Sequence, residues 1–242
     1  RVADGTLIPM RDRPITPDGS AEQAMRIASY ASVAVAFVLI FAKTYAWLAT
    51  GSVAILSSLI DSFLDALASI VTFVAVRHSL QPADREHRFG HGKVEALAAL
   101  AQSAFIVGSA VLLLFEAGAR ALAPRPITES ETGISIMLFS IGLTLGLVIL
   151  QKWAIQRSQS VAISADSLHY KGDLLMNGVV IAAIIIVSET GWTLADPLFG
   201  AAIAIYIIWS AYLIVRSSFD MLMDRELPDE EREKIRNIAL FI

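Results

Sequence analysis

Cysteine is absent from the 242 residues of this chain. Its absence excludes disulfide bonds and thiolate ligands, so any bound metal must be held by carboxylate oxygens and imidazole nitrogens. Charge is also scarce, because charged residues make up only 17% of the chain and sum to a net charge of -4. Since no basic excess is left to neutralise phosphates, the composition argues against a nucleic-acid partner.

Apolar residues dominate instead. They make up 55% of the chain, and the mean hydropathy of +0.62 is too high for an ordinary soluble domain. A helix needs about 20 residues to cross a hydrocarbon core of roughly 30 Å. The sequence therefore predicts an all-α membrane protein with six transmembrane helices, at about Ala24 to Thr50, Val53 to Val76, Val94 to Leu122, Gly133 to Ile155, Val161 to Ser188 and Leu194 to Val215.

Basic residues are divided unevenly between the two sides that six spans would define. One side carries Arg120 and Arg125, whereas the other carries a larger group: Arg11, Arg13, Arg26, Arg77, Arg85, Arg88, Lys93, Lys152, Arg157, Arg216 and Arg225. Cytoplasmic loops are enriched in Lys and Arg. The larger group therefore marks the cytoplasmic side, and both termini are expected in the cytoplasm.

Two pairs of ionisable residues interrupt the apolar spans. Asp61 and Asp65 lie in the second span and His169 and Asp173 in the fifth, and the four-residue spacing of each pair places both side chains on one helix face. In each pair the first residue lies 8 residues and the second 12 residues after the start of its span, or about 12 and 18 Å along the helix axis, and the two spans run in opposite directions. Both pairs are therefore predicted near the middle of the membrane, where together they can hold one divalent ion in the tetrahedral N/O geometry that suits zinc.

A lone buried Asp has a simpler interpretation, as a helix cap or as the partner of a lysine. Two matched pairs favour the metal site, because an ionised Asp at the bilayer centre costs roughly 2.5 to 3.5 kcal/mol and needs a cation or protons to neutralise it. Lys171 lies two residues from both His169 and Asp173 and so points to another helix face. We interpret Lys171 and Lys43 as partners or snorkelling residues rather than ligands.

A second set of metal-ligand types lies in the polar loop between the second and third spans. Asp84, His87 and His91 have D-x-x-H-x-x-x-H spacing, which fits a second and more exposed metal site. A cytoplasmic loop is polar in any case, and Arg85 and Arg88 suit a positive-inside anchor. The spacing leaves both interpretations open.

The two ends are predicted to lie outside the membrane domain. Residues 1–23 form a polar cytoplasmic tail without the apolar core of a signal peptide, residues 24–223 form the six-helix transmembrane domain, and residues 224–242 begin a cytoplasmic domain. In this last segment Asp229 can cap a new helix. Because the chain opens on Arg1 and ends within the pattern at Ile242, we expect the natural protein to extend beyond both ends.

Four motifs together resemble the cation diffusion facilitator family. They are D-x-x-x-D in the second span, H-x-x-x-D in the fifth, the loop P-A-D-x-x-H-x-F-G-H-G-K-x-E and the exit L-M-D-R-E-L-P-D, and the resemblance covers about Ser29 to Glu231. It implies a homodimer that exports divalent ions in exchange for protons, with a soluble C-terminal metal-binding domain that this chain lacks. It also implies residue roles: a transport site at Asp61, Asp65, His169 and Asp173, a loop metal site at Asp84, His87 and His91, and a charge interlock near the dimer interface at Lys93 and Asp224.

Together with the apolar spans, the resemblance implies a multi-pass transporter of a bacterial inner membrane, not an enzyme, that binds and exports Zn²⁺, with cadmium and ferrous iron as further candidates. Two other classes stay open. A magnesium-dependent intramembrane transferase that uses a diphosphate would explain Asp61 and Asp65, but it explains His169 poorly because magnesium prefers oxygen ligands. The other class is a membrane metal sensor without transport.

Overall fold

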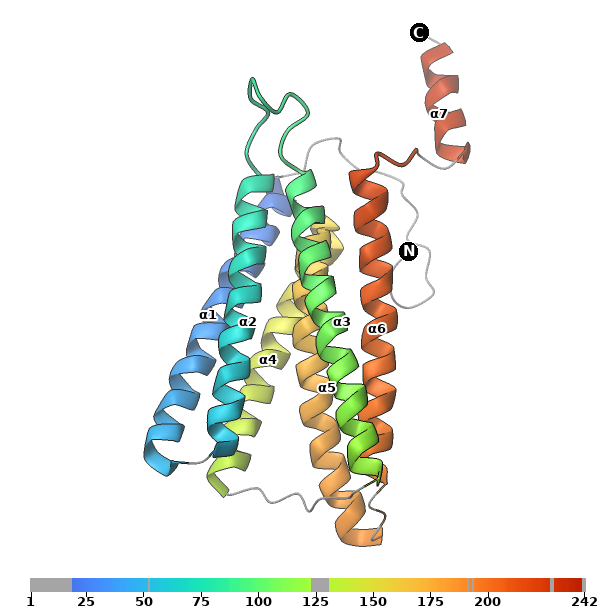
Figure 1. The fold of residues 1–242 in the computed structure, drawn as a ribbon. Helices are drawn as coiled ribbons and strands as arrows, with labels where there is room; N and C mark the ends of the chain where they lie inside the picture. Colours follow the sequence, from blue (N-terminus) through green and yellow to red (C-terminus); the bar gives the residue numbers. More distant parts are fainter. Residues whose placement is uncertain are drawn as a thin grey trace.

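The protein forms an elongated bundle of long helices in the computed structural model, which describes residues 19–51, 53–122, 131–190, 192, 194–226 and 229–240. The helices are α1 (Gly19–Thr50), α2 (Val53–Ser79), α3 (Lys93–Leu122), α4 (Glu131–Ser158), α5 (Val161–Thr190), α6 (Ala195–Leu222) and α7 (Asp229–Leu240). Helices α1 to α6 run alternately in opposite directions, and α7 stands apart beyond the end of the bundle that carries the loop between α2 and α3 (Figure 1). The described part of the chain is therefore all-helical, as predicted.

Each predicted span corresponds to one long helix, although the ends differ. Helix α1 begins at Gly19 rather than Ala24, and α6 continues to Leu222 rather than ending at Val215. Hydropathy marks the part of a helix that suits lipid, whereas backbone hydrogen bonding continues through its polar ends. The predictions for residues 1–18, for Arg125 and for Ile242 lie outside the described residues.

Five helical segments in the described residues are long and apolar enough to cross a membrane: Gly19–Thr50, Ser58–Ser79, Lys93–Leu122, Ser135–Ser158 and Pro197–Leu222. Helix α5 is not among them. A sixth crossing by α5 stays a prediction.

Left-handed backbone conformations end two of the helices at predicted breaks. Gly51 has φ of +64° and donates its N–H to the carbonyl of Trp47 at 2.7 Å, which ends α1 before the chain reverses into α2. Gln159 has φ of +56° and donates its N–H to the carbonyl of Ile155 at 2.8 Å, which ends α4 in the same way. These short connections make α1 and α2, and likewise α4 and α5, antiparallel neighbours.

Helix α5 packs against both halves of the bundle. On one side Ala165 and Leu168 join a buried cluster from α3 and α6 that includes Ile106 and Ile207. On the other side Ala162 and Ile163 join a second buried cluster. Its other members are Ala24, Met25 and Ala28 of α1, Val76 of α2 and Ala154 of α4. The predicted metal ligands of α5 therefore stand inside the bundle rather than on its surface.

Glycine permits the close approach of α5 and α6 beside the predicted ligands. A Cβ atom added to Gly172 would lie 3.1 Å from Cδ1 of Ile207, which is tighter than most carbon contacts in proteins. Gly172 lies directly before Asp173 in the chain. The absence of a side chain there lets α6 form one wall beside the metal ligands.

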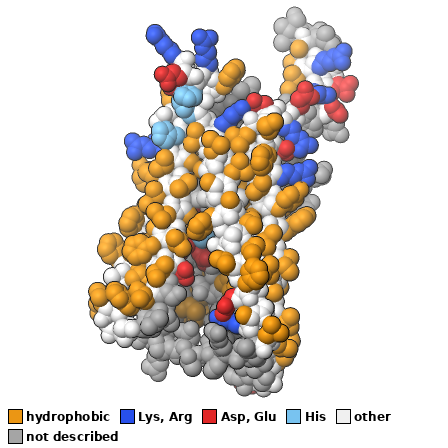
Figure 2. Space-filling model, viewed as in Figure 1, with side chains coloured by type: hydrophobic (Ala, Val, Ile, Leu, Met, Phe, Trp, Pro, Cys, Tyr) orange, Lys and Arg blue, Asp and Glu red, His pale blue; other side chains and the backbone are white. Residues whose placement is uncertain are grey.

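The surface of the bundle matches a membrane environment. Hydrophobic side chains cover the long body of the molecule, whereas Lys and Arg side chains gather at the end that carries the loop between α2 and α3 (Figure 2). Large apolar residues such as Phe41 and Phe115 are more than two-thirds exposed, at 71% and 73%. Such a surface is stable in lipid but not in water. The gathering of basic residues at one end agrees with the predicted asymmetry, and its assignment to the cytoplasm stays a prediction.

Candidate metal centre

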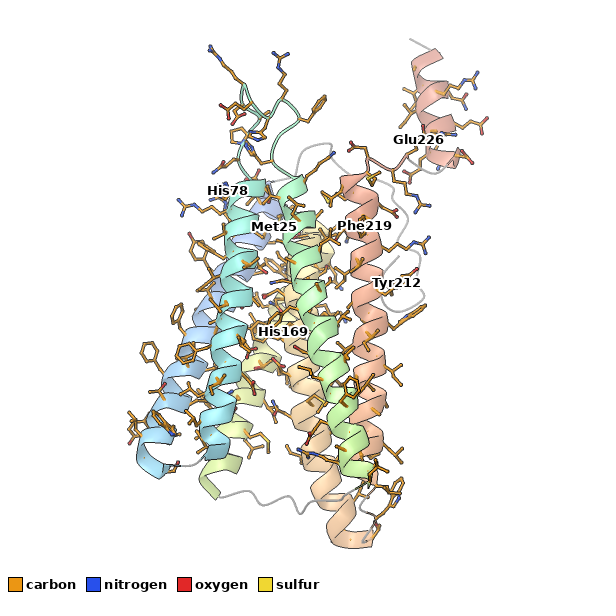
Figure 3. The ribbon with its side chains drawn as sticks, in the orientation of Figure 1. Met25, His78, His169, Tyr212, Phe219 and Glu226 are labelled. Carbon is orange, nitrogen blue, oxygen red and sulfur yellow. The ribbon has the colours of Figure 1, made fainter. Side chains whose placement is uncertain are left out.

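Three predicted ligands from two helices meet inside the bundle. Asp65 of α2 and His169 and Asp173 of α5 each offer one ligand atom, and these atoms all lie within 4.8 Å of one another. The His169 Nε2 atom lies 2.7 Å from Oδ1 of Asp65 and 4.0 Å from Oδ2 of Asp173. Figure 3 shows His169 about midway along the bundle, far from the labelled His78 near one end of α2. The predicted depth of the group agrees with this position.

The three side chains line a cavity of about 330 Å³. Its remaining walls are mostly apolar and come from α2, α3, α5 and α6: Leu64, Phe105, Ile106, Ser109, Ala110, Leu113, Leu168, Gly172, Met176 and Ile207. The side chains of Asp65 and His169 are 13% and 15% exposed, whereas that of Asp173 is 43% exposed. Polar ligands in an apolar cavity are the usual arrangement of a specific small-ion or small-molecule site.

Asp61 lines the same cavity, one helical turn before Asp65, but its carboxylate is not one of the three grouped ligands. Its side chain is exposed. The structure thus brings together three of the four residues predicted for the intramembrane site. A site in which all four residues surround one ion stays a proposal.

Lys43 of α1 contacts the same face of α2. Its ammonium donates to Oγ of Ser62 at 2.7 Å and to the carbonyl of Ser58 at 3.1 Å. These hydrogen bonds agree with the interpretation of Lys43 as a partner rather than a ligand. Lys171 is half-buried and lines neither the cavity nor the group of three ligands.

The loop residues Asp84, His87 and His91 also form a group whose ligand atoms lie within 4.8 Å of one another. The Asp84 carboxylate lies 3.3 Å from Nδ1 of His87 and 3.6 Å from Nε2 of His91. The backbone N–H of His87, and then that of Glu86, donates to Oδ1 of Asp84 and lowers the pKa of this carboxyl below its ordinary value. Within the described residues, the buried Nδ1 of His91 has no hydrogen-bond partner. These features are compatible with a metal site, and the assignment of the loop as a metal site stays a proposal.

Lys93 and Asp224 form the predicted ion pair, within one chain. The Lys93 ammonium lies 2.8 Å from Oδ2 of Asp224 and also donates to the carbonyl of Leu222 at 3.3 Å. The pair joins the start of α3 to the turn after α6. Its position near a dimer interface stays a prediction.

Sequence reasoning did not single out two buried carboxylates. Asp166 of α5 accepts hydrogen bonds from Ser32 and Gln151, and Glu95 of α3 accepts hydrogen bonds from Ser79 and Ser160. The signal for both was present, because each is an acidic residue within an apolar span. Their partners come from other helices, and residue spacing along one helix does not predict such partners.

The fold and the grouped ligands define a class: an all-helical membrane protein with an intramembrane carboxylate and imidazole cluster. Comparison with known sequences identifies the family. Residues 29–223 match the cation efflux transmembrane domain. The chain is 50% identical over 215 residues to the cation-efflux pump FieF of Shewanella oneidensis, covering 89% of this chain and 72% of that protein.

Two further relatives carry the same name. FieF of Klebsiella pneumoniae is 46% identical and FieF of Escherichia coli 45% identical, each over 212 residues that cover 88% of this chain and 70% of the relative. The chain therefore belongs to the cation efflux family, which is the cation diffusion facilitator family that its motifs resemble. As a member of this family with several apolar helices, it is a multi-pass protein of a bacterial inner membrane.

Proposed function

We propose that this protein exports divalent metal cations, with Zn²⁺ as the leading candidate, from the cytoplasm in exchange for protons. The observation that carries this proposal is the meeting of Asp65, His169 and Asp173 in an intramembrane cavity. Family membership supports it, because the FieF relatives are named as cation-efflux pumps.

The donor set supports a first-row divalent ion. Two or three carboxylates and one imidazole supply hard oxygens and one nitrogen, which suit zinc and are acceptable to ferrous iron and cadmium. The ion also neutralises carboxylates that would otherwise be costly in the membrane. Asp61 already lines the cavity, so a small movement of its side chain toward the other three ligands would complete the set.

The hydrogen bond within the site supports competition between metal and protons. The 2.7 Å contact between Nε2 of His169 and the Asp65 carboxylate places a proton between the two ligands. A metal ion bound by both atoms takes the place of that proton, because metal ligands must be deprotonated. In the cytoplasm-facing state metal displaces protons, and in the outward-facing state protons displace metal. Rocking of helices around this midplane site would expose it to each side in turn, and the proton gradient then drives export.

Several further assignments belong to this proposal. They are six membrane crossings with both termini in the cytoplasm, a second metal at Asp84, His87 and His91, and a homodimer with the Lys93 and Asp224 pair near its interface. The loop and this ion pair lie at the end of the bundle where basic side chains gather. That placement supports a cytoplasmic location for both features.

The cavity disfavours the transferase alternative. A diphosphate-using enzyme needs Arg or Lys side chains beside its metal-binding carboxylates. Among the described residues that line the cavity, none is Arg or Lys. A metal sensor without transport shares the same ligands, so metal flux distinguishes it from a transporter.

Metal flux into proteoliposomes tests the proposal. We expect liposomes that contain the protein to accumulate Zn²⁺, measured by a trapped fluorescent indicator. Uptake should be faster when the liposome interior is more acidic than the outside, because protons then leave as metal enters. Asp173→Ala and protein-free liposomes serve as controls. Zn²⁺ binding without flux would favour a sensor, and absence of both would refute the proposed function.

A further inference from the structure

A fully buried carboxylate lies one helical turn before His169 and outside the group of metal ligands. Asp166 is 1% exposed, and its Oδ2 accepts hydrogen bonds from Oγ of Ser32 at 2.5 Å and Nε2 of Gln151 at 2.7 Å. Its Oδ1 lies 3.4 Å from Oγ of Ser69. The donors come from α1, α4 and α2, so one carboxylate of α5 joins four helices. We call these four residues the carboxylate joint.

The partners of Asp166 in the joint are fully buried. Ser32, Ser69 and Gln151 are all 0% exposed. The Ser69 hydroxyl also lies 2.8 Å from Oγ of Ser32 and 2.8 Å from the phenol oxygen of Tyr170. Leaving a buried polar group unpaired is costly. Removal of Asp166 would therefore leave Nε2 of Gln151 without its acceptor and would break the hydrogen bonds to Ser32 and Ser69. The joint thus specifies how α5 sits against its neighbours.

The joint and the metal ligands make two side-chain contacts between α2 and α5, one helical turn apart. Helices α2 and α5 run antiparallel (Figure 1), and Asp65 pairs with His169 in the first contact. Ser69 lies four residues after Asp65, and Asp166 lies three residues before His169, so these two residues form the second contact. At 1.5 Å per residue the two contacts are only about 5 Å apart along the helices.

This proximity makes the position of His169 depend on the joint. A shift of α5 by one residue would move its side chains by about 1.5 Å and rotate them by about 100°. Such a shift would break the 2.7 Å contact between His169 and Asp65. Holding Asp166 in place therefore keeps the imidazole facing the carboxylate of α2.

We propose that Asp166 is a positioning residue for the intramembrane metal site, which holds α5 in the register that presents His169 and Asp173 to the ion without touching the ion itself. The proposal rests on the proposed function, since it assigns a role relative to a transported metal. The proposed role depends on the hydrogen bonds that the Asp166 side chain accepts, not on its negative charge.

Two substitutions of Asp166 separate the effect of its hydrogen bonds from the effect of its charge. In Asp166→Asn the amide oxygen can accept from Ser32 and Gln151, and the amide nitrogen can donate to Ser69, so the joint survives. In Asp166→Ala all of these bonds are lost. A positioning role predicts that Asn rescues what Ala destroys.

The test uses the full chain in a background of Asp84→Ala and His87→Ala, so that the loop does not contribute to metal binding. We expect Asp166→Ala to weaken Zn²⁺ binding and raise the KM of flux by about 10- to 100-fold, as loss of a group that orients metal ligands does. The absorption spectrum of bound Co²⁺ should change as well, because it reports ligand geometry. Asp166→Asn should stay within about threefold of the parent in Kd and KM.

A matched pair of serines keeps the proposal testable if Asp166→Ala does not fold. Ser32 and Ser103 are both 0% exposed, but within the described residues Ser103 Oγ has no hydrogen-bond partner. Ser32→Ala should weaken Zn²⁺ binding by the folded protein severalfold, whereas Ser103→Ala should not.

Three results would overturn the assignment: parental Zn²⁺ affinity in folded Asp166→Ala, equal loss in Asp166→Asn and Asp166→Ala, or equal effects of the two serine variants. Failure of the parent itself to bind Zn²⁺ would instead refute the proposed function.

Discussion

Replacement of Asp65 by Asn is the most direct test of the metal centre. The substitution keeps the shape of the side chain but removes the negative charge that lies 2.7 Å from Nε2 of His169. We expect the variant to fold and insert normally, because an amide can still hydrogen-bond the imidazole and a neutral side chain is less costly in the membrane. Metal transport should be abolished.

The size of the effect follows from the burial of the site. The side chain of Asp65 is 13% exposed, so its interaction with an ion is little screened by water. Removing one partner of a buried charge pair costs about 3 to 5 kcal/mol. At 1.4 kcal/mol for each power of ten, the Kd for Zn²⁺ should rise by roughly 10²- to 10³-fold or more.

Calorimetric titration of purified protein and flux into proteoliposomes measure these two effects. Asp220→Asn is the matched control, because Asp220 is a carboxylate of the same bundle that pairs with Arg225 at 2.7 Å near the end of α6, away from the cavity. The control should bind and transport like the parent. Zn²⁺ affinity within threefold of the parent in Asp65→Asn, with normal flux, would refute the assignment of Asp65 as a ligand.

Three further predictions concern coupling, selectivity and the loop. Acidifying the metal-loading side should slow flux because protons compete with the metal ion for the same ligands, and a trapped pH dye that detects no proton counterflow would contradict exchange. Asp61→His should keep zinc flux and reduce cadmium flux, because a second imidazole makes the site less anionic and better suited to zinc; an unchanged ratio in competition assays would mean that Asp61 does not set selectivity. Asp84→Ala with His87→Ala should remove one bound Zn²⁺ per folded chain while leaving flux in place, as counted by metal analysis. In the parent, the lowered pKa of Asp84 keeps this carboxylate ionised, and so able to bind the loop metal, until the pH falls through that lowered value.

Local sequence was sufficient to predict the class of protein and the rough position of the group of ionisable side chains inside the bundle. Apolar runs of about 20 residues specify membrane helices through the cost of unpaired backbone groups in lipid. The four-residue spacings of Asp61 with Asp65 and of His169 with Asp173 place each pair on one helix face. These relations involve neighbours on a single helix, so no knowledge of packing is needed.

Contacts between helices required the folded structure. Which carboxylate meets His169 depends on the rotation of α2 and α5 about their own axes, and that rotation is set by packing against α1, α3, α4 and α6. Hence Asp65 contacts the imidazole while Asp61, although it shares the helix face predicted from spacing, lies outside the group.

The role of Asp166 illustrates the same limit. Its hydrogen-bond partners Ser32 and Gln151 are 134 and 15 residues away in the chain and belong to different helices. Serine and glutamine in an apolar span carry no spacing signal that identifies an acceptor on another helix. Only close packing of four helices brings these groups within hydrogen-bonding distance, and burial then makes each bond costly to lose.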